Sequence, residues 1–203
     1  MNLAQAFPLA PLFGNFSAMS GYVHELSGQT SATVDSNYSV IQATGAAFKV
    51  SVTSNATGSS VLTTAWVLRN GTVSSASQAG YNFTGTRAQQ LLLQSMNPLL
   101  LEVSQSTLTP TPSEVGAKVT NQSTITIGPT KVSVSNYASD ELPVTLTQCT
   151  TTQTVTSFVF QTGIAQGATF PLLTVFGVDA YQIVDGQLYP IEVVFMLTSV
   201  TVG

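Results

Sequence analysis

The chain has 203 residues, of which 43% are hydrophobic and only 7% are charged, whereas roughly a quarter of an ordinary soluble domain is charged. The five basic residues are scattered, so no basic patch can neutralise several phosphates, which excludes nucleic-acid binding. No run of about 18 apolar residues occurs, and no basic segment followed by an apolar one opens the chain. We therefore expect no membrane span and no signal peptide, with either a leader already removed or an unusual route of export.

Residues 1–30 are rich in Phe, Leu, Ala and Pro and differ from the rest of the chain. Large side chains of one parity alternate here with small ones, which is typical of an extended segment that buries one face. These large residues are Leu3, Phe7, Leu9 and Phe13. Pro8 and Pro11 each remove a backbone donor, which argues against a helix and against a central strand. We expect an extended N-terminal arm that lies at a sheet edge or in a groove.

From residue 31 to residue 203, short runs of β-branched and aromatic residues alternate with turn residues, as in a sandwich or barrel. The predicted fold is all-β, an Ig-like or jelly-roll-like β-sandwich preceded by the arm. The predicted strands are Tyr38–Ala43, Ala46–Thr53, Val61–Arg69, Ala79–Thr84, Leu99–Ser104, Thr124–Ile127, Lys131–Ser135, Leu142–Gln148, Thr154–Gln161, Phe170–Val178, Tyr181–Val184 and Ile191–Val202.

Two turns and one helix stand out within residues 31–203. Asn70–Gly71 and Asp185–Gly186 are dipeptides typical of type I′ hairpins. Arg87–Met96 contains three consecutive leucines and is followed by Asn97–Pro98, which predicts a helix that ends there.

Residues that support catalysis or metal binding are scarce. The chain has one histidine, His24, one cysteine and isolated acidic residues, which do not form a metal-ligand pattern. No Gly-x-Ser-x-Gly turn presents a nucleophile. We expect no enzyme activity, no metal and no cofactor.

The sequence is dense in acceptors for N-glycosylation. Six of the nine asparagines lie in Asn-x-Ser/Thr motifs without proline, although Ser and Thr make up only about a quarter of the chain. These are Asn15, Asn37, Asn55, Asn70, Asn82 and Asn121. The motifs predict covalent N-glycans and an extracellular location, with Asn70 at a hairpin tip and Asn15 in the apolar arm.

The shortage of charge also fits an acidic environment. At about pH 2 to 3, carboxylates with pKa values near 4 are mostly protonated, and ion pairs that depend on them are lost. A fold that does not use such pairs loses little stability there.

The apolar arm, the Ser/Thr-rich strands and the six acceptors together resemble the subunits of archaeal thread filaments, which are cell-surface fibres of thermoacidophiles. The resemblance is one of organisation across the whole chain. It implies a heavily N-glycosylated β-domain whose arm completes the sheet of the next subunit by donor-strand complementation. Leu3, Phe7, Leu9 and Phe13 would then fill pockets on a neighbouring copy, and head-to-tail contacts would build an extracellular homopolymer.

Two other classes of protein remain open. Met1 favours a jelly-roll capsid or other virion protein of a virus that infects similar organisms, because virion proteins need no leader. A carbohydrate-binding or adhesin module is the other alternative, in which Trp66 and the tyrosines would supply stacking faces. Because Trp66 is centred in a strong predicted strand, we expect it to be a core residue.

Glycosylation predicts an intact mass above the 21.2 kDa of the polypeptide for protein purified from its native source. Mass spectrometry of the intact chain measures the difference, since each occupied acceptor adds one glycan. A mass equal to that of the sequence would contradict the prediction.

Overall fold

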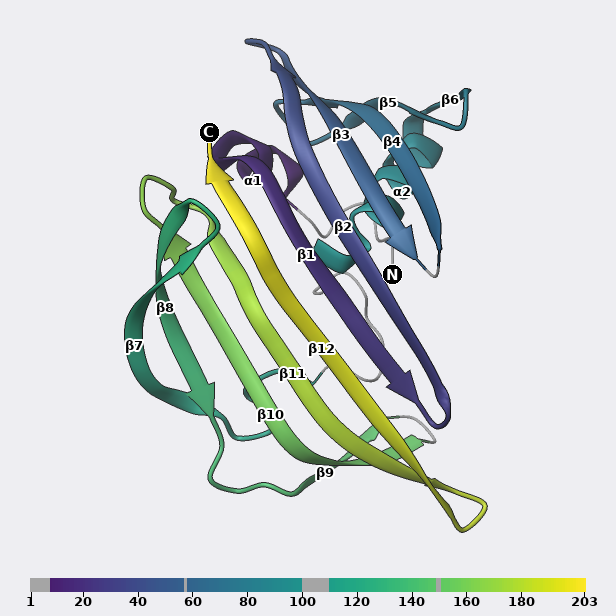
Figure 1. Cartoon of the computed structure of the whole chain (residues 1–203), viewed down its shortest axis with the longest axis vertical. Coiled ribbons are helices and arrows are strands. Elements are labelled where there is room, and N and C mark those ends of the chain that lie inside the picture. Colours follow the sequence, from purple (N-terminus) through teal and green to yellow (C-terminus); the bar gives the residue numbers. More distant parts are fainter. Residues whose placement is uncertain (1–7, 57, 100–109, 149–150) are drawn as a thin grey trace.

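A computed structural model describes residues 8–56, 58–99, 110–148 and 151–203. Over these residues, twelve strands form one antiparallel sheet in the order β6-β5-β4-β3-β2-β1-β12-β11-β10-β8-β7, and β9 pairs with another part of β10 (Figure 1). The strands are β1 (Phe16–Ser27), β2 (Thr30–Ala43), β3 (Ala47–Ala56), β4 (Ser59–Leu68), β5 (Val73–Gln78), β6 (Tyr81–Thr84), β7 (Lys118–Ile127), β8 (Thr130–Ala138), β9 (Val144–Gln148), β10 (Thr151–Ala165), β11 (Pro171–Val184) and β12 (Gln187–Val202). The helices are α1 (Leu9–Asn15), α2 (Gly85–Ser95) and the 3₁₀ turn η2 (Asn97–Leu99).

The chain enters the sheet at its centre. Strands β1 to β6 follow one another outward to one edge, and after α2 the sheet resumes at the opposite edge with β7. Strands β10, β11 and β12 lead back to the centre, where β12 pairs with β1 from Phe16↔Val202 to Ser27↔Ile191. This pairing, which we call the seam, joins the two halves of the sheet.

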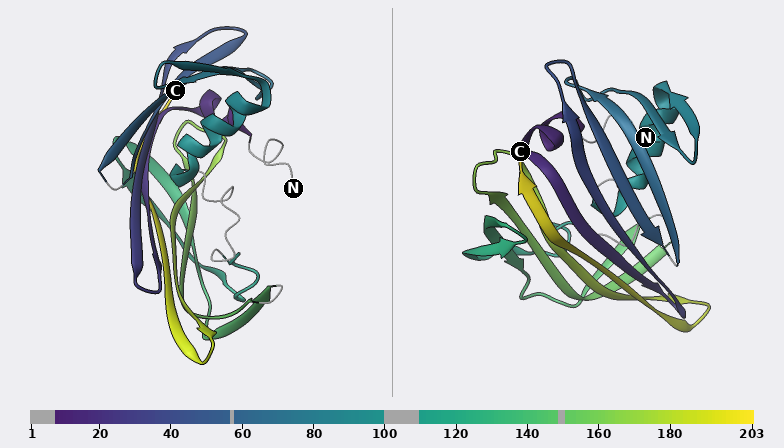
Figure 2. Two further views of the ribbon diagram at one scale, coloured as in Figure 1. Left: turned by 90° about the vertical axis from the view of Figure 1, so that its right-hand side faces the viewer. Right: turned by 45° about the horizontal axis from the view of Figure 1, so that its top comes forward.

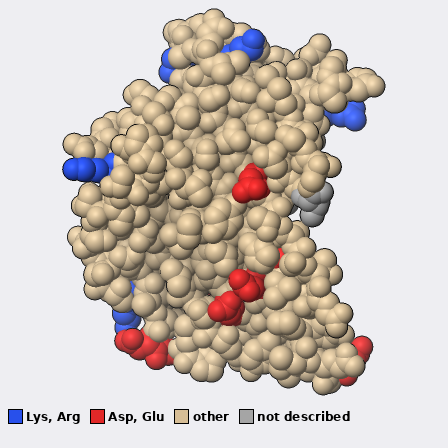
Figure 3. Space-filling model, in the orientation of Figure 1, with Lys and Arg blue, Asp and Glu red and all other residues tan. Residues whose placement is uncertain are grey.

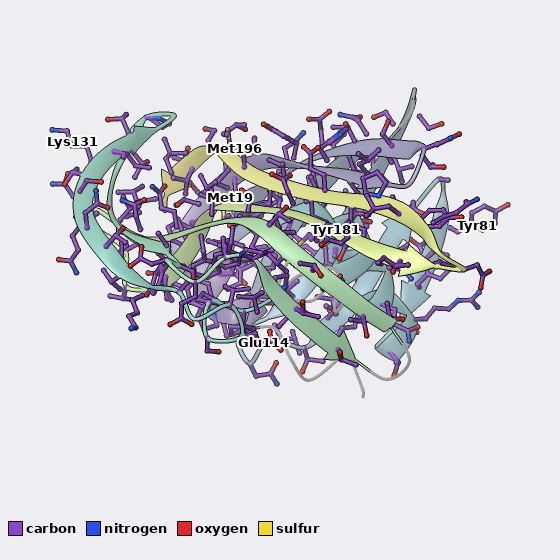
Figure 4. All side chains as sticks on the ribbon, turned by 90° about the horizontal axis from the view of Figure 1, so that it is seen from below. Met19, Tyr81, Glu114, Lys131, Tyr181 and Met196 are labelled. Carbon is purple, nitrogen blue, oxygen red and sulfur yellow. The ribbon has the colours of Figure 1, made fainter. Side chains whose placement is uncertain are left out.

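The hydrophobic core lies on one face of the sheet, here called the inner face. In profile the sheet is a curved layer with α1 and α2 on its concave side (Figure 2). Alternation along the strands sends every second side chain to this face: Met19 is 3% exposed, whereas Met196 is 39% exposed and lies on the opposite, outer face (Figure 4). From α2, Ala88, Leu92 and Leu93 are buried against the inner face.

The all-β prediction of the sandwich type is confirmed, with the two halves hydrogen-bonded through the seam into one curved sheet. The predicted helix Arg87–Met96 is present as α2. Most of the predicted strand Leu99–Ser104 lies outside the described residues, and Leu99 itself belongs to η2.

The turns agree with the sequence at one hairpin and differ at another. Asp185 and Gly186 have φ values of 51° and 78°, as the type I′ turn requires. At the β4–β5 connection only Gly71 has a positive φ, of 88°, so Asn70 does not take part in a type I′ turn. Ala79 and Gly80, with φ values of 51° and 83°, join β5 to β6.

The extended conformation predicted for the arm is wrong over residues 9–15, which form α1, and the predicted position at a sheet edge or in a groove is wrong over residues 16–27, which form β1. Leu9, Leu12 and Phe13 share one face of α1 at the helical spacing i, i+3, i+4, and all three are buried. Pro11 lies in the first turn, where backbone N–H groups have no partner within the helix, so proline is tolerated. The next element, β1, is a central strand that pairs with both β2 and β12.

Two of the four predicted donor-strand residues are part of this chain's own core, and the other two, Leu3 and Phe7, lie outside the described residues. Leu9 is 1% exposed and Phe13 is 3% exposed. The Phe13 ring meets the Tyr38 ring edge-on, with 5.1 Å between centroids. The Tyr38 hydroxyl donates to the Phe16 carbonyl oxygen at 3.3 Å.

Phe13→Ala is expected to lower the free energy of unfolding of the isolated monomer by about 3–5 kcal/mol, because it leaves a cavity beneath Tyr38. Denaturant unfolding measures the change. Tyr81→Ala is a matched control, since Tyr81 is 72% exposed and its removal should cost less than about 0.5 kcal/mol. Equal stability of the two variants would contradict the burial of Phe13 and leave it available to a neighbouring subunit.

Candidate functional site

The register of four strands gathers polar side chains into two rows on the outer face of the sheet. Residues paired across neighbouring strands point to the same face. The first row is Ser51, Thr64, Ser77 and Asn82, and the second is Lys49, Trp66, Ser75 and Thr84.

A groove of about 290 Å³ lies along these rows, which we call the Trp66 groove. Its walls come from β3, β4, β5 and β6, and it is lined by Lys49, Thr64, Ala65, Trp66, Ser75, Ala76, Ser77, Asn82, Phe83 and Thr84. The hollow has a simple origin: small serines of β5 stand beside the large Trp66 ring, so the surface drops from one strand to the next.

Trp66 is half-exposed at this groove, and the prediction that it is a core residue is wrong. Its neighbours Ala65 and Val67 are 2% and 0% exposed, so they occupy the inner face and alternation places Trp66 on the outer one. Lys49 Nζ lies 5.6 Å from the centroid of the Trp66 ring.

Four of the six glycosylation acceptors lie in the half of the sheet that runs from β2 to β6. Asn37 is exposed on β2, Asn55 is half-buried on β3, and Asn82 is exposed on β6. Asn70 is exposed in the β4–β5 turn, where its side-chain oxygen accepts the Thr72 backbone N–H at 3.0 Å.

The other two acceptors make hydrogen bonds within the fold. Asn121 is exposed on β7, and its side-chain oxygen accepts a hydrogen bond from the Asn136 amide. Asn15 is half-buried: its amide nitrogen donates to the Pro11 carbonyl at 2.8 Å, and its oxygen accepts the Thr169 backbone N–H at 2.7 Å. Asn15 thus ties the end of α1 to the β10–β11 connection.

Three of the five basic side chains lie over aromatic rings. Besides Lys49 over Trp66, the Arg69 guanidinium lies 3.8 Å from the Phe48 ring centroid and Arg87 lies 5.5 Å from that of Phe83. Arg69 also donates two hydrogen bonds to the backbone carbonyl of Thr44. Figure 3 shows that the outer face is mostly uncharged, with a few scattered charged groups and one place at its lower left where acidic and basic groups lie side by side.

The residues considered for catalysis and metal binding do not converge. Nδ1 of His24 lies 2.7 Å from the Thr33 hydroxyl on the neighbouring strand β2. Within the part of the chain that the structure describes, no three His, Cys, Asp or Glu side chains gather as metal ligands would. None of the described helices has the length and apolar character needed to cross a membrane.

The second notable feature is the long edge strand β7. Among the residues that the structure describes, it is the last strand of the sheet and pairs with β8 alone, whereas the opposite edge strand, β6, has only four residues. Nearly all of β7 is exposed, and residues 121–127 contain neither a charge nor a proline. The sequence predicted a strand at Thr124–Ile127 but could not place it at an edge, because periodicity does not encode strand order.

The orientation of the open groups on β7 follows from its turn. Ile127 and Thr130 flank the two-residue connection Gly128–Pro129 and are paired, which makes them a hydrogen-bonded pair. Bonded and non-bonded pairs alternate along an antiparallel ladder. Thr126 and Thr124 therefore direct their backbone N–H and C=O groups away from β8, into solvent.

Comparison with known proteins identifies no family. No protein-family model and no curated protein matches the chain. Solved structures with some likeness include MucB in complex with MucA(peri), at 13% identity and a TM-score of 0.33 over 93% of this chain and 50% of that one. MucB alone is 12% identical, with a TM-score of 0.35 over 96% of this chain and 56% of that one. The complex structure of Pseudomonas aeruginosa MucA/MucB is 14% identical, with a TM-score of 0.34 over 100% of this chain and 55% of that one. The chain spans about half the length of these proteins.

The melting temperature is expected to change little between pH 3 and pH 7. Acid unfolding usually follows protonation of carboxylates that are paired in the folded state, whereas Lys49, Arg69 and Arg87 lie over aromatic rings that do not titrate. Thermal melts followed by circular dichroism give the profile, and a steep fall near pH 4 would contradict it.

The alkaline side should behave differently because of Tyr38. Burial raises the pKa of the Tyr38 hydroxyl well above its ordinary value of 10.0. The neutral form is thus favoured in the folded state, so stability is fully present below about pH 10 and declines as the pH rises further. Tyr38→Phe should make this decline shallower, while costing about 1 kcal/mol at neutral pH through the lost bond to Phe16.

Proposed function

We propose that the chain is a structural subunit of an extracellular homopolymer, which carries N-glycans and joins its copies through the open edge strand β7. The observation that carries this proposal is the length and exposure of β7. The resemblance of the whole chain to thread-filament subunits agrees with the proposal. The contact surface proposed here is the edge of the sheet at β7.

An open strand edge is a template for pairing with another chain. Proteins that stay monomeric cover such edges, or protect them with charges, prolines and bulges. On β7 a bulge between Val119 and Asn121 and the charge of Lys118 affect only the first residues. Residues 121–127 remain an uncharged stretch, β-branched from Thr124 onward, whose outward N–H and C=O groups have no neighbouring strand in the described sheet.

The polymer requires a second surface that differs from β7. Two β7 strands paired about a twofold axis would close as a dimer, whereas contact with a different surface can repeat without end. The opposite edge, β6, would continue the sheet from copy to copy. Because Leu9 and Phe13 fill this chain's own core, a donor strand would have to come from the residues before α1, where Leu3 and Phe7 lie.

The positions of the glycosylation acceptors support the same arrangement. Asn37, Asn55, Asn70 and Asn82 all belong to the β2–β6 half of the sheet, and β7 is the far edge of the other half. Glycans on these four residues would solvate a surface with few charges while leaving β7 accessible. A virion protein could use the same edge, in which case the assembly would be a closed shell.

Thr124→Pro is expected to abolish assembly and leave the monomer folded. Proline removes an outward N–H from β7 without removing a bond to β8, and edge strands tolerate it. Thr124→Ala, which keeps the N–H, is the matched control. Light scattering measures assembly, negative-stain images distinguish fibres from shells, and circular dichroism verifies the fold.

The proposal is contradicted if wild-type protein stays monomeric at high concentration at both pH 3 and pH 7. It is also contradicted if Thr124→Pro assembles as well as Thr124→Ala. Assembly of Thr124→Pro would show that copies of the chain do not join through the edge of β7, even if they form a polymer.

A further inference from the structure

We propose that the Trp66 groove binds a pyranose ring of a saccharide, a property that goes beyond the structural role proposed above. The inference rests on one aromatic surface, a set of short polar side chains and a single amine, which four neighbouring strands bring together around a hollow.

The shape of the groove limits the size of its ligand. Pockets for small molecules commonly enclose about 300–1,000 Å³, and the 290 Å³ found here is at the lower end. The floor is formed by Ser75 and Ser77 of β5, with Trp66 on one side and Asn82 and Thr84 of β6 on the other. A single ring fits such a hollow, and a longer chain would continue along the outer face.

The chemistry of the lining suits a sugar better than other small ligands. A pyranose ring presents C–H groups from one face and hydroxyl groups around its rim, so it needs an aromatic surface together with donors and acceptors. Trp66 offers the aromatic surface, and Lys49 Nζ, 5.6 Å from its centroid, offers donors beside it. No carboxylate is among the ten lining residues, so nothing there repels an acidic sugar.

Several of these polar groups are available to a ligand. The hydroxyl oxygens of Thr64 on β4 and Ser77 on β5 are 3.1 Å apart and form a hydrogen bond with each other. Within the described residues, the side chains of Ser75, Asn82 and Thr84 make no hydrogen bond. Three short polar side chains without partners thus lie across the hollow from a half-exposed indole ring, an arrangement that a sugar's hydroxyl groups would satisfy.

A saccharide could reach the groove from two sources. Asn82 lines the groove and is also the acceptor of the motif Asn82-Phe83-Thr84, so a glycan attached to it would begin at the wall of the hollow. A separate polysaccharide, from another subunit or from a surface, would bring the same chemistry from outside. The two sources are distinguished by comparing protein with and without its glycans.

The first arm uses unglycosylated protein produced in a bacterial cytoplasm. Trp66 is the only tryptophan of the chain, so its fluorescence reports on the groove alone. Titration with mannotriose, cellotriose and chitotriose, each to about 10 mM, should give a saturable change in emission with at least one of them. Ser75→Leu, which fills the hollow, should abolish that change, and Ser133→Leu on β8 should leave it intact.

The second arm compares glycosylated protein with the unglycosylated protein of the first arm, and both keep Asn82 in the groove. If the glycan on Asn82 occupies the groove, iodide will quench Trp66 at least twofold more strongly in the unglycosylated protein, and added saccharide will bind to that protein only. If the natural ligand is separate, both proteins will bind it equally. The proposal is wrong if no saccharide changes Trp66 emission in the first arm and quenching is unchanged in the second. Neither result affects the test of β7, which is read by assembly.

Discussion

The hydrophobic burial that holds this fold together takes place on a single face of the sheet. The inner face packs against α1 and α2 and contains the largest fully buried side chains, among them Tyr38, Phe16 and Phe195. Because alternation along a strand assigns neighbouring residues to opposite faces, filling the inner face leaves the other half of each strand in contact with solvent. The outer face is therefore free to carry hydroxyls, amides and Trp66, which together form the groove.

Much of this architecture could be predicted from the sequence, because the central strands of both halves show the alternation that burial on one face produces. The helix α2 was predicted from its leucines and from the Asn97–Pro98 stop. The acceptors Asn37 and Asn82 are exposed. The type I′ turn at Asp185–Gly186 was also predicted, since it depends on two adjacent residues alone.

The remaining features could not be predicted, for identifiable reasons. In α1 the helical spacing of Leu9, Leu12 and Phe13 overlaps an alternation of large and small residues, so one pattern concealed the other. In β1 the inward position at Gly21 has no side chain, because a Cβ there would lie 2.8 Å from the Met196 carbonyl oxygen. The alternation of apolar and polar residues that predicts a strand is therefore interrupted in β1. The groove and the edge at β7 depend on strand order, which local sequence does not specify.

Few charges, aromatic partners for the bases and an open sheet edge form one coherent set of properties. A cation over an aromatic ring keeps its partner in acid, whereas a cation paired with a carboxylate does not. Hydrogen bonds between strands are equally insensitive to pH. Solubility then depends on hydroxyls and on the proposed glycans, while cohesion within the chain, and between copies in the proposed polymer, depends on interactions that acid does not titrate.

The seam has a consequence for how the protein is made. During synthesis β1 leaves the ribosome early and its partner β12 late, so the central ladder forms between segments that are far apart in sequence and is slow to close. At the end of that ladder the Gly203 N–H donates to the Asn15 carbonyl at 2.9 Å, which brings Gly203 beside the start of β1. Until then, the nascent chain exposes the full length of β1 as an unpaired edge. Closure of the seam thus competes with pairing between molecules, and a cell that makes this protein must keep its chains apart until β12 has been completed.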